Sequence, residues 1–255
     1  MEVEALAKQT KAATLWGLFI VVVCTAIAVP VGMVTYFLDD ALPMAVEKTI
    51  NNVVHIRNNS GGWQGSGVLV APDLVLTARH VVEGGNDFDI MTNDGKVYKA
   101  SRAISSKKYD IGFIKLDIGL ACTTQLGSIE DCRLGEPVYA IGSPYGDTNF
   151  NSVTLGIISS VHSELENFDC PKDYGWSVTF QTDANGEPGN SGCPVFTMDG
   201  VVRGILVGGF SNGIIYCIPV DVIRSDIGVI QRMFKEDNYR LEVGFVPTVT
   251  VSEDY

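Results

Sequence analysis

The chain has 255 residues, 27 of them glycine, and a formal net charge of −12. This length is enough for one or two domains with a hydrophobic core, and the many glycines fit a β-rich fold with many turns. The negative charge argues against a nucleic-acid-binding protein, which would present a basic face.

The first predicted element is a membrane-spanning helix. Between Lys11 and Asp39 no charged residue occurs, and about 20 apolar residues suffice to cross a bilayer. Lysines precede this run and aspartates follow it, so the positive-inside rule places the N-terminus in the cytoplasm and the remainder outside. We therefore expect a cytoplasmic tail at residues 1–12, an uncleaved transmembrane signal anchor at 13–38 and a linker at 39–47.

The alternative for this segment is a cleaved signal peptide. Ala26-Ile27-Ala28 has the small-residue pattern of a cleavage site behind a short apolar region. Against this alternative, the apolar run continues through residues 29–38, which a mature N-terminus would expose. The pattern favours the anchor.

Residues 48–236 are predicted to form one all-β domain that ends in a helix. Short apolar runs alternate with turn residues, and "FDIMTNDGKVYKASRAI" predicts a hairpin that bends at Asn-Asp-Gly. Strands this short, at this spacing, favour a β-sandwich or a pair of barrels. Ile223, Ile227, Ile230 and Phe234 then recur at helical spacing and predict a single amphipathic helix. Residues 237–255 are expected to be an acidic C-terminal tail.

The cysteines suggest neither a metal site nor a fixed disulfide pattern. Six are present, and Cys24 lies in the apolar run. Cys122 and Cys132 flank a short polar segment and could close a loop in an oxidising compartment, whereas the remaining three cannot be paired from sequence. No CxxC motif or His/Cys cluster occurs, so we expect neither a metal nor a cofactor.

Three separate residues suggest nucleophilic catalysis. Ser191 lies in "PGNSGCPVF", where flanking glycines allow a turn that aims two backbone N–H groups at one point. His80 ends the apolar run "LVLTAR", and Asp110 opens the apolar run "DIGFIKL". A buried carboxylate there would be stabilised by an imidazole N–H and would fix the tautomer of the ring. His55 and His162, in contrast, are typical of ordinary strand or surface histidines. The order His, Asp, Ser is one of the known triad orders.

Four stretches carry a resemblance to a known family: "GSGVLVAPDLVLTARHVV", "YDIGFIKL", "AIGSPYG" and "QTDANGEPGNSGCPVF". Over about residues 53–234 the chain resembles the trypsin-like (chymotrypsin-fold) serine proteases, most closely their Deg/HtrA-like branch. The resemblance implies two six-stranded β-barrels with the active site between them. It implies His80 as general base, Asp110 as the residue that orients it, Ser191 as nucleophile, and the N–H groups of Gly189 and Ser191 as oxyanion hole.

The resemblance also implies substrate-binding residues, and the sequence departs from the family at two points. Asn185, six residues before the serine, and Ile215 in "GIIYCIP" are expected to shape an apolar P1 pocket. A substrate strand is expected to pair with Leu206, Val207, Gly208 and Gly209. Where the family usually has glycine, two residues after the serine, this chain has Cys193. A PDZ domain, common after the protease in this branch, is not expected in so short a tail.

The leading hypothesis is a membrane-anchored serine endopeptidase that faces away from the cytoplasm and cleaves protein or peptide substrates in quality control or processing. The alternatives are a non-catalytic binding module on a protease fold and a dedicated processing protease of viral or phage type. No nucleic-acid partner is expected, and homo-oligomerisation is left open.

Overall fold

A computed structural model describes residues 40–163, 176, 178–210, 213–236 and 245–248. The expected anchor at 13–38 lies outside these residues. Among the helices that are described, none is long and apolar enough to cross a bilayer. The chain divides into two compact units, residues 1–44 and 45–255, and both β-sheets belong to the second unit.

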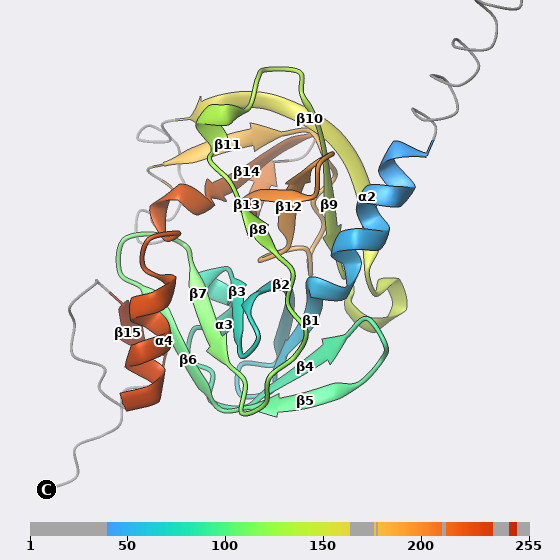
Figure 1. The fold of residues 1–255 in the computed structure, drawn as a ribbon. Helices are drawn as coiled ribbons and strands as arrows, with labels where there is room; N and C mark the ends of the chain where they lie inside the picture. The colour runs from blue at the N-terminus through green and yellow to red at the C-terminus, as the bar shows by residue number, and fades with distance from the viewer. Residues whose placement is uncertain (1–39, 164–175, 177, 211–212, 237–244, 249–255) are drawn as a thin grey trace, which may run out of the picture. The chain divides into compact units, whose positions relative to one another are not determined.

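The first sheet, here called the N-terminal sheet, has eight strands in the order β15-β6-β7-β3-β2-β1-β4-β5 (Figure 1). The strands are β1 (Val53–Asn58), β2 (Trp63–Ala71), β3 (Leu74–Thr77), β4 (Phe88–Thr92), β5 (Val97–Ala100), β6 (Arg102–Ser106), β7 (Gly112–Lys115) and β15 (Phe245–Pro247). The predicted hairpin is confirmed as β4 and β5, and Gly95 in its bend has a φ of 78°, a value that glycine adopts without strain.

The expectation of a closed six-stranded barrel is wrong for the N-terminal sheet. One edge of β6 pairs with β7, and its other edge pairs with β15, where Phe245 lies opposite Ser106. Because both edges of β6 are occupied, β5 cannot close the ring against it. The strand β15 lies within the stretch expected to be a tail, so this part of the tail extends the sheet.

The second sheet, here called the C-terminal barrel, is a closed ring of six strands in the order β12-β9-β10-β11-β14-β13, with β12 paired to β13. Its strands are β9 (Pro137–Gly142), β10 (Ser152–Ser163), β11 (Thr179–Thr182), β12 (Pro194–Thr197), β13 (Val201–Phe210) and β14 (Ile214–Pro219), and β8 (Gln125–Leu126) adds to β13 in parallel. Phe180, Val195, Leu206 and Cys217 belong to the apolar cluster that fills it. The prediction of a six-stranded barrel is confirmed here.

Helical elements are few among the described residues. The α-helices are α2 (Ala41–Thr49), α3 (Arg79–Val82) and α4 (Ile227–Glu236), and the 3-10 turns are η1 (Ile50–Asn52), η2 (Ile129–Asp131), η3 (Gly146–Asn149) and η5 (Val220–Val222). The predicted C-terminal helix is confirmed as α4, which buries Ile230 and Phe234. The expected linker contains most of α2. Thr49 in α2 lies 3.0 Å from the buried Tyr139 hydroxyl.

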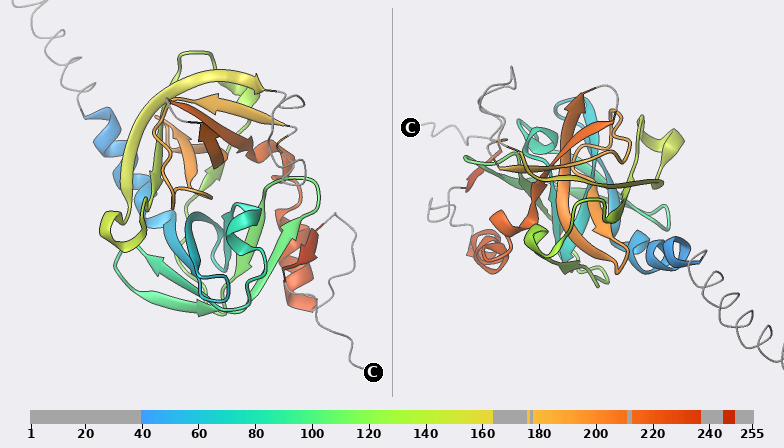
Figure 2. Two further views of the ribbon diagram at one scale, coloured as in Figure 1. Left: turned by 180° about the vertical axis from the view of Figure 1, so that it is seen from behind. Right: turned by 90° about the horizontal axis from the view of Figure 1, so that it is seen from above.

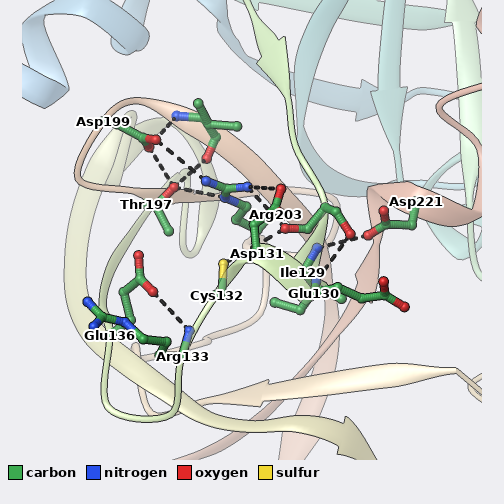
Figure 3. A network of polar contacts seen from close by, with 12 residues as sticks. Ile129, Glu130, Asp131, Cys132, Arg133, Glu136, Thr197, Asp199, Arg203 and Asp221 are labelled. Carbon is green, nitrogen blue, oxygen red and sulfur yellow. Dashed lines mark hydrogen bonds and ion pairs between the residues drawn. The ribbon is translucent and has the colours of Figure 1, made fainter.

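A buried arginine ties two connections of the C-terminal barrel together (Figure 3). Arg203 in β13 is 8% exposed. Its Nε donates to Thr197 Oγ1 at 3.0 Å, and its Nη1 donates to the Ser128 carbonyl at 3.0 Å. Asp131 and Asp199 each lie 3.5 Å from its guanidinium. These partners offset the cost of burying the charge, so the network fixes the connection around η2 against the β12–β13 hairpin.

Candidate active site

The structure brings His80 and Asp110 together at the end of two paired strands. Thr77, the last residue of β3, pairs with Gly112, the first residue of β7. His80 lies in α3, just after β3, and Asp110 lies just before β7. Seen from behind, α3 lies close to where the N-terminal sheet meets the C-terminal barrel (Figure 2). The strand pairing therefore sets the distance between the two side chains.

The contact between the two side chains is direct. His80 Nδ1 lies 2.9 Å from Asp110 Oδ2 and 3.1 Å from Oδ1, and the backbone N–H of His80 donates to Oδ1 at 3.1 Å. Asp110 is fully buried, whereas the side chain of His80 is 30% exposed. An ionised carboxylate only accepts hydrogen bonds, so Nδ1 carries the proton and Nε2 holds the lone pair of the neutral ring.

The loop between β11 and β12 presents Ser191 with two unused backbone donors. Asn190, Gly192 and Cys193 donate their N–H groups to carbonyl oxygens at 2.9, 2.7 and 2.9 Å. Within the described part of the chain, the N–H groups of Gly189 and Ser191 donate to no protein acceptor. These are the two groups that the family resemblance implies as an oxyanion hole.

Glycine is required at two positions of this loop because the backbone is tightly seated. Gly189 has a φ of 103°, and a Cβ there would lie 2.4 Å from the Ser143 carbonyl oxygen. Gly192 has a φ of 86°, and a Cβ there would lie 2.1 Å from Thr77 Oγ1 and 3.0 Å from the Ala78 nitrogen. Ala78 lies two residues before the candidate base, so the serine loop and the histidine turn are in contact.

Sequence reasoning missed Ser66, which supports this loop from the N-terminal sheet. Ser66 is fully buried in β2, and its Oγ donates to the Gly189 carbonyl at 2.8 Å and accepts the Ser143 N–H at 2.9 Å. Its backbone N–H donates to the Ser191 carbonyl at 2.8 Å. The sequence marks Ser66 only by the glycine on each side of it in "GSGVLV". The first of these, Gly65, leaves room for the serine loop, because a Cβ there would lie 2.8 Å from the Ser191 carbonyl oxygen.

Most of the predicted substrate-binding residues lie together on β13 and β14. Leu206, Val207, Gly208 and Gly209 follow one another on β13. Ile215 on β14 is 4% exposed and pairs with Gly209. A Cβ on Gly186 would lie 3.0 Å from Ile215 Cδ1 and 3.3 Å from Leu206 Cδ1, and both side chains belong to the apolar cluster that fills the C-terminal barrel. Asn185 is exposed, and its carbonyl oxygen accepts a 3.4 Å hydrogen bond from Asn190 Nδ2.

A cavity of about 540 Å³ opens beside Gly189. Arg57, Trp63 and Tyr145 contribute to its lining. Trp63 and Tyr145 are exposed large aromatic residues, and the Tyr145 hydroxyl donates to Glu187 Oε2 at 2.7 Å.

The other histidines and the cysteines do not join this site. His55 is buried in β1 and lies 3.2 Å from both Gln64 Oε1 and Asp147 Oδ1, and burial lowers its pKa. Burial raises the pKa of the Cys193 thiol to about 12, so this thiol is a poor nucleophile. The side chain of His162 lies outside the described residues.

No disulfide joins Cys122 to Cys132, since both are free cysteines. Cys122 Sγ instead donates to the Leu69 carbonyl at 3.3 Å. The described residues hold no group of three or more His, Cys, Asp or Glu side chains suited to a metal ion.

A closed six-stranded barrel beside a second antiparallel sheet, with a histidine–carboxylate pair and a glycine-flanked serine at their junction, defines the class of chymotrypsin-fold peptidases. The profile of the family described as "Trypsin-like peptidase domain" matches residues 65–205. The chain belongs to this family.

Matches to individual proteins confirm the resemblance to the Deg/HtrA-like branch of this family. Over 165 residues the chain is 39% identical to a "Probable periplasmic serine endoprotease DegP-like" of Halomonas elongata, a match that covers 62% of this chain and 33% of the relative. Over 194 residues it is 37% identical to "Serine protease HTRA1" of Xenopus tropicalis, covering 71% and 41%. The structure "HtrA-type protease AlgW with tripeptide" matches with a TM-score of 0.65 and 27% identity, covering 76% and 63%. The chain thus spans 33–41% of the length of these two curated relatives.

Proposed function

We propose that this chain is a serine endopeptidase in which His80, Asp110 and Ser191 form a catalytic triad. The observation that carries the proposal is the pairing of a fully buried Asp110 with His80, beside a serine loop that has two unused N–H donors. A binding module needs neither the carboxylate that orients an imidazole nor the paired donors. Relatives named as serine endoproteases support the same activity.

In the proposed mechanism, Ser191 Oγ attacks the carbonyl carbon of the scissile peptide bond. Its proton passes to His80 Nε2, and the carbonyl oxygen becomes an oxyanion that the N–H groups of Gly189 and Ser191 stabilise. The intermediate then collapses, and the leaving amine takes the proton from His80. His80 Nε2 then takes a proton from water as the water attacks the acyl-enzyme carbonyl. The same nitrogen returns this proton to Ser191 Oγ as the carboxylic acid leaves. Asp110 stays ionised throughout and stabilises the imidazolium.

The proposed substrate is an extended stretch of protein or peptide. A strand that pairs with residues 206–209 would receive main-chain hydrogen bonds, and side-chain pockets would set its specificity. Ile215 Cδ1 would lie 3.0 Å from a Cβ on Gly186, and a branched side chain there would shorten the P1 pocket and favour small aliphatic P1 residues such as Val or Ala. Asn185 carries no charge that could pair with Lys or Arg. A tripeptide is bound in the solved structure of AlgW, which supports a peptide as ligand.

We further propose that residues 13–38 anchor the chain in a membrane with the protease domain outside the cytoplasm, in protein quality control or processing. The uncharged run in the sequence supports the anchor, and a relative named as periplasmic supports the compartment. Protease added to the outer face of the membrane should digest residues 39–255. Protection of this part, or its recovery as a soluble species that lacks residues 1–28, would overturn the anchor.

Labelling with a fluorophosphonate probe tests the catalytic proposal. The wild type should form a covalent adduct, and Ser191→Ala should not. Ser225→Ala, which removes an exposed serine from the loop before α4, should label like the wild type. Equal labelling of Ser191→Ala, or no labelling of a folded wild type, would refute the assignment. Metal chelators should leave the labelling of the wild type unchanged.

A further inference from the structure

Asp110 has a side-chain partner that the proposed triad does not use. Trp176 Nε1 donates a hydrogen bond to Asp110 Oδ2 at 3.0 Å. The same oxygen lies 2.9 Å from His80 Nδ1, while Oδ1 accepts the backbone N–H of His80 at 3.1 Å. Because Asp110 is fully buried, each donor offsets part of the cost of removing the carboxylate from water.

The indole ring of Trp176 is seated on the strand that is proposed to bind substrate. A Cβ on Gly208 would lie 2.5 Å from Trp176 Cη2, so only glycine leaves room for the ring. The ring centroids of Trp176 and Tyr216 are 6.0 Å apart with an interplanar angle of 38°. Gly208 and Tyr216 pair across β13 and β14. The ring thus lies against the C-terminal barrel while its N–H points at a carboxylate of the N-terminal sheet.

These contacts determine how the carboxylate is oriented. The His80 backbone N–H fixes Oδ1, and the indole N–H fixes Oδ2, so the plane of the carboxylate has little freedom to rotate about χ2. In this orientation both carboxylate oxygens lie within 3.1 Å of Nδ1 of the ring. Among the described residues, the other donors to this carboxylate all belong to His80, and they would move together with the histidine.

We propose that Trp176 is a positioning residue that orients Asp110, and through it His80, for proton transfer from the serine. This inference rests on the proposed function. It also places the edge of the Trp176 ring beside Gly208, on the strand that is proposed to bind substrate. A peptide that pairs with β13 would therefore lie next to the residue that orients the triad carboxylate.

The test is Trp176→Phe in the full-length protein, which keeps an aromatic ring on Gly208 and removes the N–H. Fluorophosphonate labelling at a series of probe concentrations separates the maximal rate of inactivation from the half-saturating concentration. The maximal rate should fall about tenfold, the order expected for loss of a hydrogen bond to a charged group, with the half-saturating concentration unchanged. Gly208→Ala should lower the same rate by displacing the ring. Trp16→Phe, which changes a tryptophan in the apolar N-terminal run, should match the wild type.

A spectroscopic readout accompanies the kinetics. The Nδ1 proton of His80 should give a far-downfield NMR signal in protein labelled with 15N-histidine, and Trp176→Phe should shift this signal, whereas Trp16→Phe should not. An unchanged maximal rate and signal in Trp176→Phe would overturn the positioning role. A raised half-saturating concentration with an unchanged maximal rate would also overturn this role, because it would show that Trp176 contributes only to binding. If the folded wild type does not label at all, the proposed function fails, and the Nδ1 signal still decides whether Trp176 orients the pair.

Discussion

Ser66 Oγ donates a 2.8 Å hydrogen bond to the carbonyl oxygen of Gly189, a residue 123 positions further along the chain. The bond joins the N-terminal sheet to the loop that carries Ser191. It holds the Gly189 carbonyl toward β2 and so fixes the peptide unit between the two residues whose N–H groups are unused, Gly189 and Ser191. The geometry of the proposed oxyanion hole therefore depends on both sheets.

Ser66→Ala should lower the rate of fluorophosphonate labelling by about tenfold, because the Gly189 carbonyl and the Ser143 N–H both lose a buried partner. The measurement is the labelling rate of purified protein at saturating probe. Ser152→Ala, which removes a hydroxyl from an exposed bond to Asn149, is the matched control and should keep the wild-type rate. Equal rates for the two variants would show that Ser66 does not support the site.

His80→Ala should lower peptide hydrolysis by several orders of magnitude, because the base is lost while the oxyanion donors remain. Asp110→Asn should have an effect of about 10⁴-fold, because an amide N–H facing Nδ1 favours the wrong tautomer of the ring. The turnover number of each purified variant is the measurement, with circular dichroism to show that the fold persists. Turnover close to that of the wild type in either variant would contradict the assigned roles.

Much of the proposed site could be predicted from sequence because its signals are local. The three proposed triad residues each lie in a short stretch where turn residues meet an apolar run. The roles of Ser66 and Trp176 could not be predicted, because their partners are 123 and 66 positions away and no local pattern marks these pairings.

The open N-terminal sheet was missed for a similar reason. Its β15 is only three residues long and pairs with a strand far back in the chain. A segment this short leaves no alternating pattern that distinguishes it from a polar tail. The amphipathic helix α4, in contrast, has enough residues to show its period.

The free energy of unfolding should fall as the pH drops below 6.5, in part because of His55. Burial lowers the pKa of this ring in the folded protein from 6.5, so the unfolded chain binds the proton more tightly. The stabilising contribution is complete above pH 6.5 and is lost as the pH falls toward the lowered value. Urea denaturation at pH 5 and pH 7.5 measures the effect. His55→Gln should show a smaller difference between the two pH values, and an equal difference would contradict this account.

Arg203→Met should destabilise the protein by about 2 kcal/mol, because Thr197 Oγ1 and the Ser128 carbonyl lose a charged donor inside the C-terminal barrel. Asp131→Asn should lower the free energy of unfolding much less, since the Asp131 side chain is 70% exposed and water can replace its contact with Arg203. Urea denaturation at neutral pH compares the two. A larger loss for Asp131→Asn would show that the ion pair, not the hydrogen bonds of the guanidinium, stabilises the network.

The bond that is cut should be decided largely by Ile215. Its side chain is 4% exposed and lies against Gly186 and Gly209, where the family resemblance implies the P1 pocket. A branched side chain there shortens the pocket, so Val and Ala should be favoured over aromatic or basic P1 residues. Each methylene is worth about 1–3 kcal/mol in such a pocket, and the preference should therefore be broad.

Cleavage of an unfolded protein, profiled by mass spectrometry, measures the P1 preference. Ile215→Gly should extend cleavage to larger P1 residues, whereas Ile214→Gly, which removes the neighbouring exposed side chain of the same strand, should leave the profile unchanged. Dominant cleavage after Arg, Lys, Phe or Tyr by the wild type would refute the pocket assignment.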